Sequence, residues 1–332
     1  MRASVRFLFA ASILWLAAAL VAPAYAQQPT TVNPTAERVQ EEQLLKALKK
    51  AEGRGTLADT KSQLLEQPAG RDWRQFQQVT LPWIGAIGIL GMLGLLVLFF
   101  LIRGMIRIEN GRSGRTLVRF NSFERFVHWM TAFSFIILAV SGLNITFGRA
   151  LLTPLLGPET FATWAQWAKY AHNYLSFPFT IGVVLIFLMW IAWNFPSGAD
   201  FRWIREGGGI IGNKHPPARR FNAGQKVIYW VVVLGGGAVA VTGYLLFFPF
   251  YVTDMAGQQL AHLIHGIAGM LFIAIMLAHI YIGTIGMQGA FEAMGSGEVD
   301  ENWARQHHSI WHEREAARGN VKGGGGRVAP AE

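Results

Sequence analysis

Histidines inside apolar segments are the residues of this sequence whose type and spacing could do chemistry. His265 and His279 lie fourteen residues apart in one long apolar stretch. On an α-helix, fourteen residues make about four turns less roughly 40°, so both side chains project from nearly one face, about 21 Å apart along the axis. One helix could therefore offer a ligand to each of two stacked centres.

Two further histidines, His128 and His172, lie near the starts of other apolar stretches. Neutral imidazole is a good ligand for haem iron, and two imidazoles fill both axial positions, which favours electron transfer over oxygen binding. The alternative is that these histidines only hydrogen-bond between helices. The chain has no cysteine, which excludes c-type haem attachment, iron–sulfur ligation and thiolate zinc sites.

Other residues compete for the ligand positions. His262 lies one turn before His265, but it points about 100° away from the face that His279 shares with His265. A thioether could replace an imidazole, and the candidates are Met130, Met270 and Met276. His215, His307, His308 and His312 are expected to be solvated in loops or in the tail.

The elements that position these histidines are five apolar segments, near residues 81–102, 126–147, 171–193, 227–250 and 260–287. Each approaches the roughly 20 residues that a helix needs to cross hydrocarbon. With 52% hydrophobic and 15% charged residues, the sequence predicts an all-α integral membrane helical bundle, because only helices and closed barrels satisfy the backbone in lipid. An intramembrane carboxylate and an inverted repeat are both missing, which argues against a secondary transporter.

Loop charges predict the orientation. The loops after the first and third segments are rich in Lys and Arg, whereas those after the second and fourth are not. The basic loops should face the cytoplasm, which explains the net charge of +9 without a nucleic-acid partner. His128 then lies level with His279 in the inner leaflet, and His172 lies level with His265 in the outer leaflet.

The sequence outside the spans divides into three parts. Residues 1–26 read as a signal peptide, and residues 27–80 as an exported polar segment. Residues 291–332 are expected to form a cytoplasmic tail with a short helix and a flexible end. We therefore expect a bacterial inner-membrane protein with a periplasmic mature N-terminus, an extra transmembrane helix at 81–102 and a four-helix di-haem domain at 119–290.

Five stretches resemble the gamma subunit of respiratory formate dehydrogenase, a membrane cytochrome b. They are residues 123–129 (FERFVHW), 141–142 (SG), 221–226 (FNAGQK), 265–281 and 303–308. The resemblance implies two haem b groups, with His128 and His279 holding the inner one and His172 and His265 the outer one. It also implies a menaquinone or ubiquinone site at Asn222, Gly224 and Gln225. The same three residues could instead form an ordinary helix start capped by Asn222.

The resemblance further implies partners. A molybdenum or tungsten subunit would oxidise formate, and an iron–sulfur subunit would pass the electrons to this chain, which would do no formate chemistry itself. The alternatives are the cytochrome b of a hydrogenase or thiosulfate reductase, and a haem-free membrane anchor.

Overall fold

The computed structural model describes residue 43, residues 70–212 and residues 214–323. The expected signal peptide and most of the expected exported segment lie outside the described residues. The chain divides into two units, residues 9–74 and residues 1–8 with 75–332. Within the first of these, the structure describes residue 43 and the start of helix α3 (Gly70–Gln75). The account below concerns the second unit.

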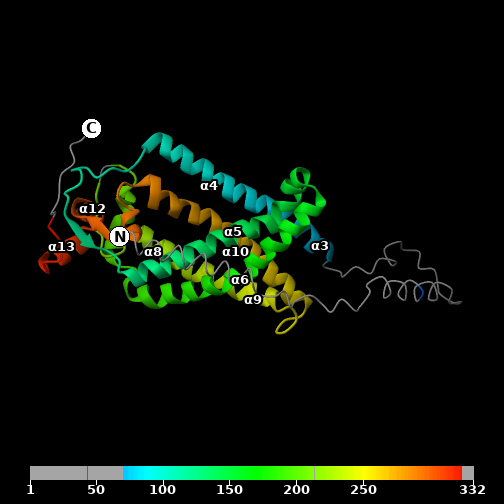
Figure 1. The fold of residues 1–332 in the computed structure, drawn as a ribbon. Coiled ribbons are helices and arrows are strands. Elements are labelled where there is room, and N and C mark those ends of the chain that lie inside the picture. The colour runs from blue at the N-terminus through cyan, green and yellow to red at the C-terminus, as the bar shows by residue number, and fades with distance from the viewer. Residues whose placement is uncertain (1–42, 44–69, 213, 324–332) are drawn as a thin grey trace. The chain divides into compact units, whose positions relative to one another are not determined.

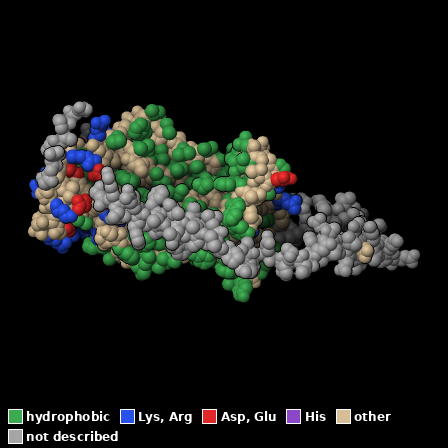
Figure 2. Space-filling view, in the orientation of Figure 1, with side chains coloured by type: hydrophobic (Ala, Val, Ile, Leu, Met, Phe, Trp, Pro, Cys, Tyr) green, Lys and Arg blue, Asp and Glu red, His purple; other side chains and the backbone are tan. Residues whose placement is uncertain are grey.

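Five helical stretches of the described chain are long and apolar enough to cross a membrane. They are Asp72–Arg103, Ser122–Leu156, Pro158–Trp193, Ala223–Phe247 and Met255–Gly286. Side chains on their outer surfaces are largely hydrophobic (Figure 2). The predicted all-α membrane bundle is therefore confirmed.

The spans are built from α-helices joined to short 3₁₀ or π segments. The first span contains the π segment η2 (Phe76–Thr80) and α4 (Leu81–Arg103), the second is α5 (Ser122–Leu156), and the third is α6 (Pro158–Trp190) with η3 (Ile191–Trp193). The fourth runs through α8 (Ala223–Trp230), η5 (Val231–Gly235) and α9 (Gly236–Phe247), and the fifth is α10 (Met255–Tyr281) with η6 (Ile282–Gly286).

The close helix contacts run from α5 to α6, from α6 to α9, from α9 to α10 and from α10 to α4 (Figure 1). Small residues let α4 and α10 approach. A Cβ on Gly85 would lie 2.7 Å from the sulfur of Met270, and one on Gly266 would lie 2.7 Å from Leu81. Such small-residue contacts are the usual means of helix packing in lipid. Most of the remaining surface of α4 is exposed and apolar.

Two spans begin at reciprocal capping boxes that the sequence encodes locally. Before α5, the side chain of Asn121 accepts from the backbone of Glu124 and the carboxylate of Glu124 accepts from the backbone of Asn121. Asn222 and Gln225 form the same reciprocal pair before α8. These capping boxes satisfy donors that a helix start leaves open.

The helices run further than hydropathy predicts. Helix α5 ends at Leu156 instead of near Phe147, and α6 begins at Pro158 instead of near Ala171. Hydropathy marks the part of a helix that crosses hydrocarbon, whereas caps and backbone conformation set its ends. Here Gly157, with φ 76°, turns the chain between the two helices.

Connecting segments gather at one end of the bundle and form a layer that we call the cap, made of residues 104–121, 194–212, 214–222 and 287–323. It contains α7 (Gly198–Arg205), the 3₁₀ turn η4 (Gly207–Gly209), α11 (Glu292–Gly295), α12 (Glu301–His307) and α13 (Ser309–Ala317). Strands β1 (Thr116–Val118) and β2 (Glu298–Asp300) pair antiparallel within it. Most of the Lys and Arg side chains visible in Figure 2 lie at this end.

The tail is part of the cap, which corrects the expectation that its histidines are solvated. His307, His308 and His312 are buried, with His308 at 0% exposure. The pairing of Leu117 with Val299 joins β2 to β1, and both side chains are fully buried. The cause lies in apolar residues of α12 and α13 that pack on this core, namely Trp303, Ala304 and Trp311. His215 is exposed as predicted.

Candidate functional site

Two pairs of histidines face one another across the bundle. His172 of α6 lies opposite His265 of α10, with ring centroids 6.1 Å apart. His128 of α5 lies opposite His279 of α10, with ring centroids 6.2 Å apart. The four residues expected to act as ligands are therefore brought together two by two, in the pairing that their depths predict.

The first pair, which we call the outer pair, is held by hydroxyl groups from neighbouring helices. The Ser141 hydroxyl lies 2.9 Å from Nδ1 of His172, and the Thr242 hydroxyl lies 3.1 Å from Nδ1 of His265. Each hydroxyl also donates to a carbonyl one turn earlier in its own helix, Ser141 to Ile137 at 2.7 Å and Thr242 to Ala238 at 2.6 Å.

These bonds assign the tautomer of both outer imidazoles. A hydroxyl carries one proton, and each of these two protons is already bonded to a carbonyl, so Ser141 and Thr242 accept from their histidines. The ring proton of His172 and of His265 therefore lies on Nδ1, and Nε2 keeps its lone pair. A ligating histidine in metal sites is fixed in the same way, by a partner on its other nitrogen.

A glycine follows each hydroxyl residue and lies against the same ring. A Cβ added to Gly142 would lie 3.3 Å from Cε1 of His172, and one added to Gly243 would lie 3.2 Å from Cε1 of His265. Ser141-Gly142 and Thr242-Gly243 thus cradle the two rings in one manner. By contrast, a Cβ added to Gly269 or Gly283, both of which lie on the fifth span, would meet open space.

The second pair, which we call the inner pair, lies nearer the cap and is less constrained. Nδ1 of His128 is buried and has no hydrogen-bond partner, whereas His279 is exposed on the surface of α10. Nδ1 of His128 therefore lacks the hydroxyl partner that fixes each outer imidazole. What marks the inner pair as candidate ligands is the facing of its two rings.

Both pairs fit a six-coordinate iron. With metal–imidazole bonds of about 2.0–2.1 Å and about 1.1 Å from nitrogen to ring centre, two axial rings need centroids roughly 6.3 Å apart, close to the values here. Among the described residues, no three His, Asp or Glu side chains gather to hold a bare metal ion. Two ligands for each centre suit a metal that already has an equatorial macrocycle.

Three of the four competing ligands have defined places in the structure. Met270 packs against Gly85 of α4, and Met276 belongs to a buried cluster with Phe179, Val183 and Phe272. His262 is exposed one turn from His265. The structure places none of these three in the facing ring pairs.

The residues considered for quinone binding form the start of α8. The side-chain oxygen of Asn222 accepts from the backbone of Gln225 at 2.9 Å, and that of Gln225 accepts from the backbone of Asn222 at 3.2 Å. A Cβ on Gly224 would lie 3.1 Å from the ring of Trp203. The capping box uses side-chain oxygens only, so both amide NH₂ groups are available as donors.

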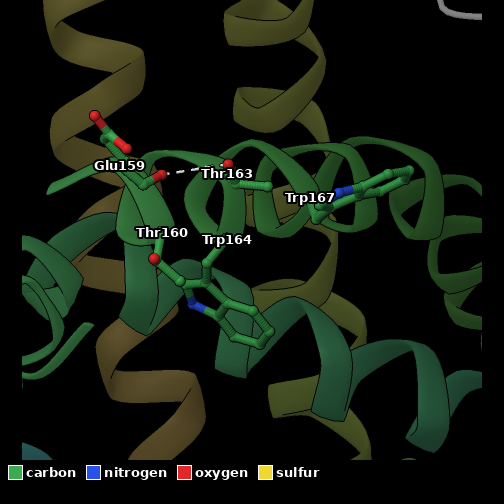
Figure 3. A pocket seen from close by; sticks show the side chains of 5 residues that line it. All are labelled: Glu159, Thr160, Thr163, Trp164 and Trp167. Atoms are coloured by element: carbon green, nitrogen blue, oxygen red, sulfur yellow. Dashed lines mark hydrogen bonds between the residues drawn. The ribbon is translucent and has the colours of Figure 1, made fainter. Parts of the chain in front are cut away.

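A separate hollow of about 460 Å³ lies at the start of α6, lined by Glu159, Thr160, Thr163, Trp164 and Trp167 (Figure 3). The Thr163 hydroxyl donates to the backbone carbonyl of Glu159 at 3.2 Å, and none of the lining residues belongs to the histidine pairs. The hollow is therefore not part of the candidate site.

Sequence reasoning missed Thr242 and Gly243. The available signal was the repetition of a hydroxyl residue followed by glycine, at 141–142 and 242–243, each in a span next to a histidine-bearing one. Ser141-Gly142 enters the sequence analysis only as one of the stretches that carry the family resemblance.

Comparison with known proteins identifies the family of the chain. The profile of the family described as prokaryotic cytochrome b561 matches residues 119–297. The Escherichia coli nitrate-inducible formate dehydrogenase cytochrome b556(Fdn) subunit is 27% identical over 215 residues, which cover 63% of this chain and 95% of the relative. A second Escherichia coli relative, the formate dehydrogenase cytochrome b556(fdo) subunit, is 27% identical over 59% of this chain and 92% of its own length. The formate dehydrogenase cytochrome b556 subunit of Haemophilus influenzae is 27% identical over 64% of this chain and 88% of its own length.

Proposed function

Because this chain belongs to the prokaryotic cytochrome b561 family and is a membrane cytochrome b that binds haem b, we propose that it is the electron-transfer subunit of a formate:quinone oxidoreductase. The proposal assigns two haem b groups to the chain, with His172 and His265 as ligands of one and His128 and His279 as ligands of the other. The observation that carries it is the pair of facing imidazoles at each depth, with the same 6.1–6.2 Å centroid separation.

Haem b supplies reversible one-electron chemistry when bound. The protein's contribution is to hold and orient the ligands. Ser141 and Thr242 accept the Nδ1 proton of the outer imidazoles, so that Nε2 keeps the lone pair that would bind the iron. Helix α10 carries one ligand of each pair, about 21 Å apart for fourteen residues, and so sets the distance between the two centres.

The relatives' names assign formate dehydrogenase to their complexes, and we extend that assignment to this chain. In our proposal, a molybdenum- or tungsten-containing partner oxidises formate outside the inner membrane, and an iron–sulfur partner would deliver the electrons to the haem that the outer pair would hold. Electrons would pass from the haem that the inner pair would hold to a quinone at Asn222, Gly224 and Gln225, where amide N–H groups can bond a quinone carbonyl. Two electrons, with two protons from the cytoplasm, would convert the quinone into a quinol. Formate chemistry belongs to the partner, and this chain supplies no catalytic residue for it.

The proposed orientation places the cap in the cytoplasm. Both Arg- and Lys-rich loops contribute to the cap, and cytoplasmic loops of membrane proteins are enriched in these residues. Electrons would then move inward, and each charge that crosses stores about 2.3 kcal/mol per 100 mV of membrane potential.

The optical spectrum of the purified full chain tests the proposal. Dithionite-reduced protein should show a b-type haem spectrum with about two haems per chain. His279→Ala should remove the inner haem and leave the outer one, and His265→Ala should do the reverse. His262→Ala is the matched control, because His262 lies one turn away in the same helix and should leave both haems in place.

A folded, colourless preparation would contradict the haem assignment and leave a membrane anchor. A preparation with two haems whose native complex oxidises hydrogen, or reduces thiosulfate, instead of oxidising formate would retain the cytochrome and contradict the formate assignment.

A further inference from the structure

The cap contains a second cavity, of about 350 Å³, that the electron-transfer function does not use. Its walls come from the strand before α5, the start of α5, the end of the third span at Trp193, the segment before α8, and α13. Five arginines line it: Arg119, Arg219, Arg220, Arg314 and Arg318. Two glutamates, Glu124 and Glu315, line it as well.

Both glutamates are already neutralised. Glu124 accepts from Arg220 at 2.7 Å and from the indole of Trp190 at 2.8 Å. Glu315 pairs with Arg318 at 3.3 Å. Five positive and two negative side chains leave a surplus of three positive charges in one small cavity, which belong to Arg119, Arg219 and Arg314.

Arg119 is buried beside the cavity at 2% exposure, and its bonding is incomplete. One terminal nitrogen, Nη2, donates to the carbonyl of Arg220 and to Nε2 of His308. Its Nε and its other terminal nitrogen, Nη1, are buried without any hydrogen-bond partner. The guanidinium carbon lies 4.5 Å above the ring of Trp311, which fixes its plane. Burial, and then the charge of Arg220, lower the pKa of Arg119 to about 9, while the carboxylate of Glu124 acts in the opposite direction.

We propose that this cavity, which we call the arginine pocket, binds a phosphate group. Guanidinium groups match the oxygens of a phosphate in geometry and charge, and several of them can share one anion. Trp193, at the end of the third span, is half exposed at the rim, which sets the pocket at headgroup depth. The phosphate can therefore come from an anionic phospholipid of the adjacent leaflet or from a free phosphate ion.

The test uses the full, haem-loaded chain in lipid nanodiscs and measures retained phospholipid by native mass spectrometry. The informative variant is Arg219→Gln with Arg314→Gln, because both side chains are exposed on the cap and neither is required for the buried core. The control is Arg202→Gln with Arg205→Gln, which removes the same charge from exposed positions of α7 outside the pocket.

With phosphatidylglycerol nanodiscs, the wild-type chain and the α7 control should retain the lipid, and the pocket variant should lose about tenfold or more in affinity. Phosphatidylcholine should bind weakly to all three, because its headgroup is neutral overall. Inorganic phosphate should displace the lipid if the pocket recognises the free ion, and it should fail to do so if the acyl chains are needed.

An equal loss of phosphatidylglycerol affinity in the pocket variant and in the α7 control would overturn the proposal, because general charge attraction would then explain the binding. Unchanged retention in the pocket variant would overturn it too. The haem spectrum of each variant is recorded in parallel, so that a damaged cap is recognised independently of phosphate binding.

Discussion

Removing the hydroxyl that supports the outer pair should raise the reduction potential of the outer haem. In Thr242→Val the side chain keeps its shape but loses the oxygen that lies 3.1 Å from Nδ1 of His265. An imidazole that donates a hydrogen bond is a more basic ligand and stabilises the ferric state more than the ferrous state. In this variant, the ferric state should therefore lose more stabilisation than the ferrous state.

The magnitude follows from the strength of one hydrogen bond. A net contribution of about 0.5–1.5 kcal/mol converts, at about 59 mV per 1.4 kcal/mol for one electron, into a rise of roughly 20–60 mV. The upper end requires that the whole bond energy act on the ferric state. A spectroscopic redox titration of the purified chain measures it, with the inner haem as an internal reference that should not move.

Thr146→Val is the matched control. Its hydroxyl also bonds a carbonyl in its own helix, that of Gly142 at 3.2 Å, but the bonds described for it include no imidazole. A fall in the outer potential, or an equal shift in both haems, would refute the reasoning, as would an unchanged potential in a variant with an intact spectrum.

Three further perturbations have defined outcomes. Gly142→Leu should reduce the haem content from about two to about one per chain, measured by pyridine haemochrome, because even a Cβ there would press on an outer imidazole; two retained haems would contradict this. Burial lowers the pKa of His307 to about 4 and that of His308 well below its usual range, so the unfolded chain binds protons that the cap excludes. Cap stability should fall by up to about 1.4 kcal/mol per pH unit per histidine between roughly pH 6.5 and about pH 4, seen as faster amide exchange after correction for the intrinsic rate; a flat profile would exclude it. Because the chain has no cysteine, Thr160→Cys and Ala316→Cys can be labelled singly in spheroplasts, where an impermeant maleimide should reach the first and spare the second; the reverse pattern would invert the proposed orientation.

The histidine pairing can be predicted because two features of the sequence agree, namely the apolar runs and the fourteen-residue spacing of His265 and His279. The apolar runs define helices that cross a layer of fixed thickness, and alternating directions then fix which histidines share a depth. The fourteen-residue gap places both histidines on nearly the same face of one helix, and this follows from helix geometry without knowledge of the packing. The structure agrees with both, since His128 and His172 each face a histidine of α10.

The cap was not predictable in the same way. Its core joins β1 to β2 across about 180 residues of sequence, as in the pairing of Leu117 with Val299, and three-residue strands carry almost no periodic signal. The charged, histidine-rich tail is therefore predicted to be solvated from the sequence alone. The role of Thr242 escaped for a related reason, because a hydroxyl in an apolar span reveals its partner only when the neighbouring helix is in place.

Both ligand pairs use a histidine of α10. The relative orientation of the two centres therefore depends on the number of helix residues between these two histidines. An added or deleted residue between His265 and His279 would rotate one imidazole by about 100° relative to the other and move it by about 1.5 Å. Substitutions in α5 or α6 can adjust one centre alone, whereas length changes in the middle of α10 cannot. Evolution and protein engineering are thus free to vary the flanking helices of this protein, while the number of residues in that one interval stays fixed.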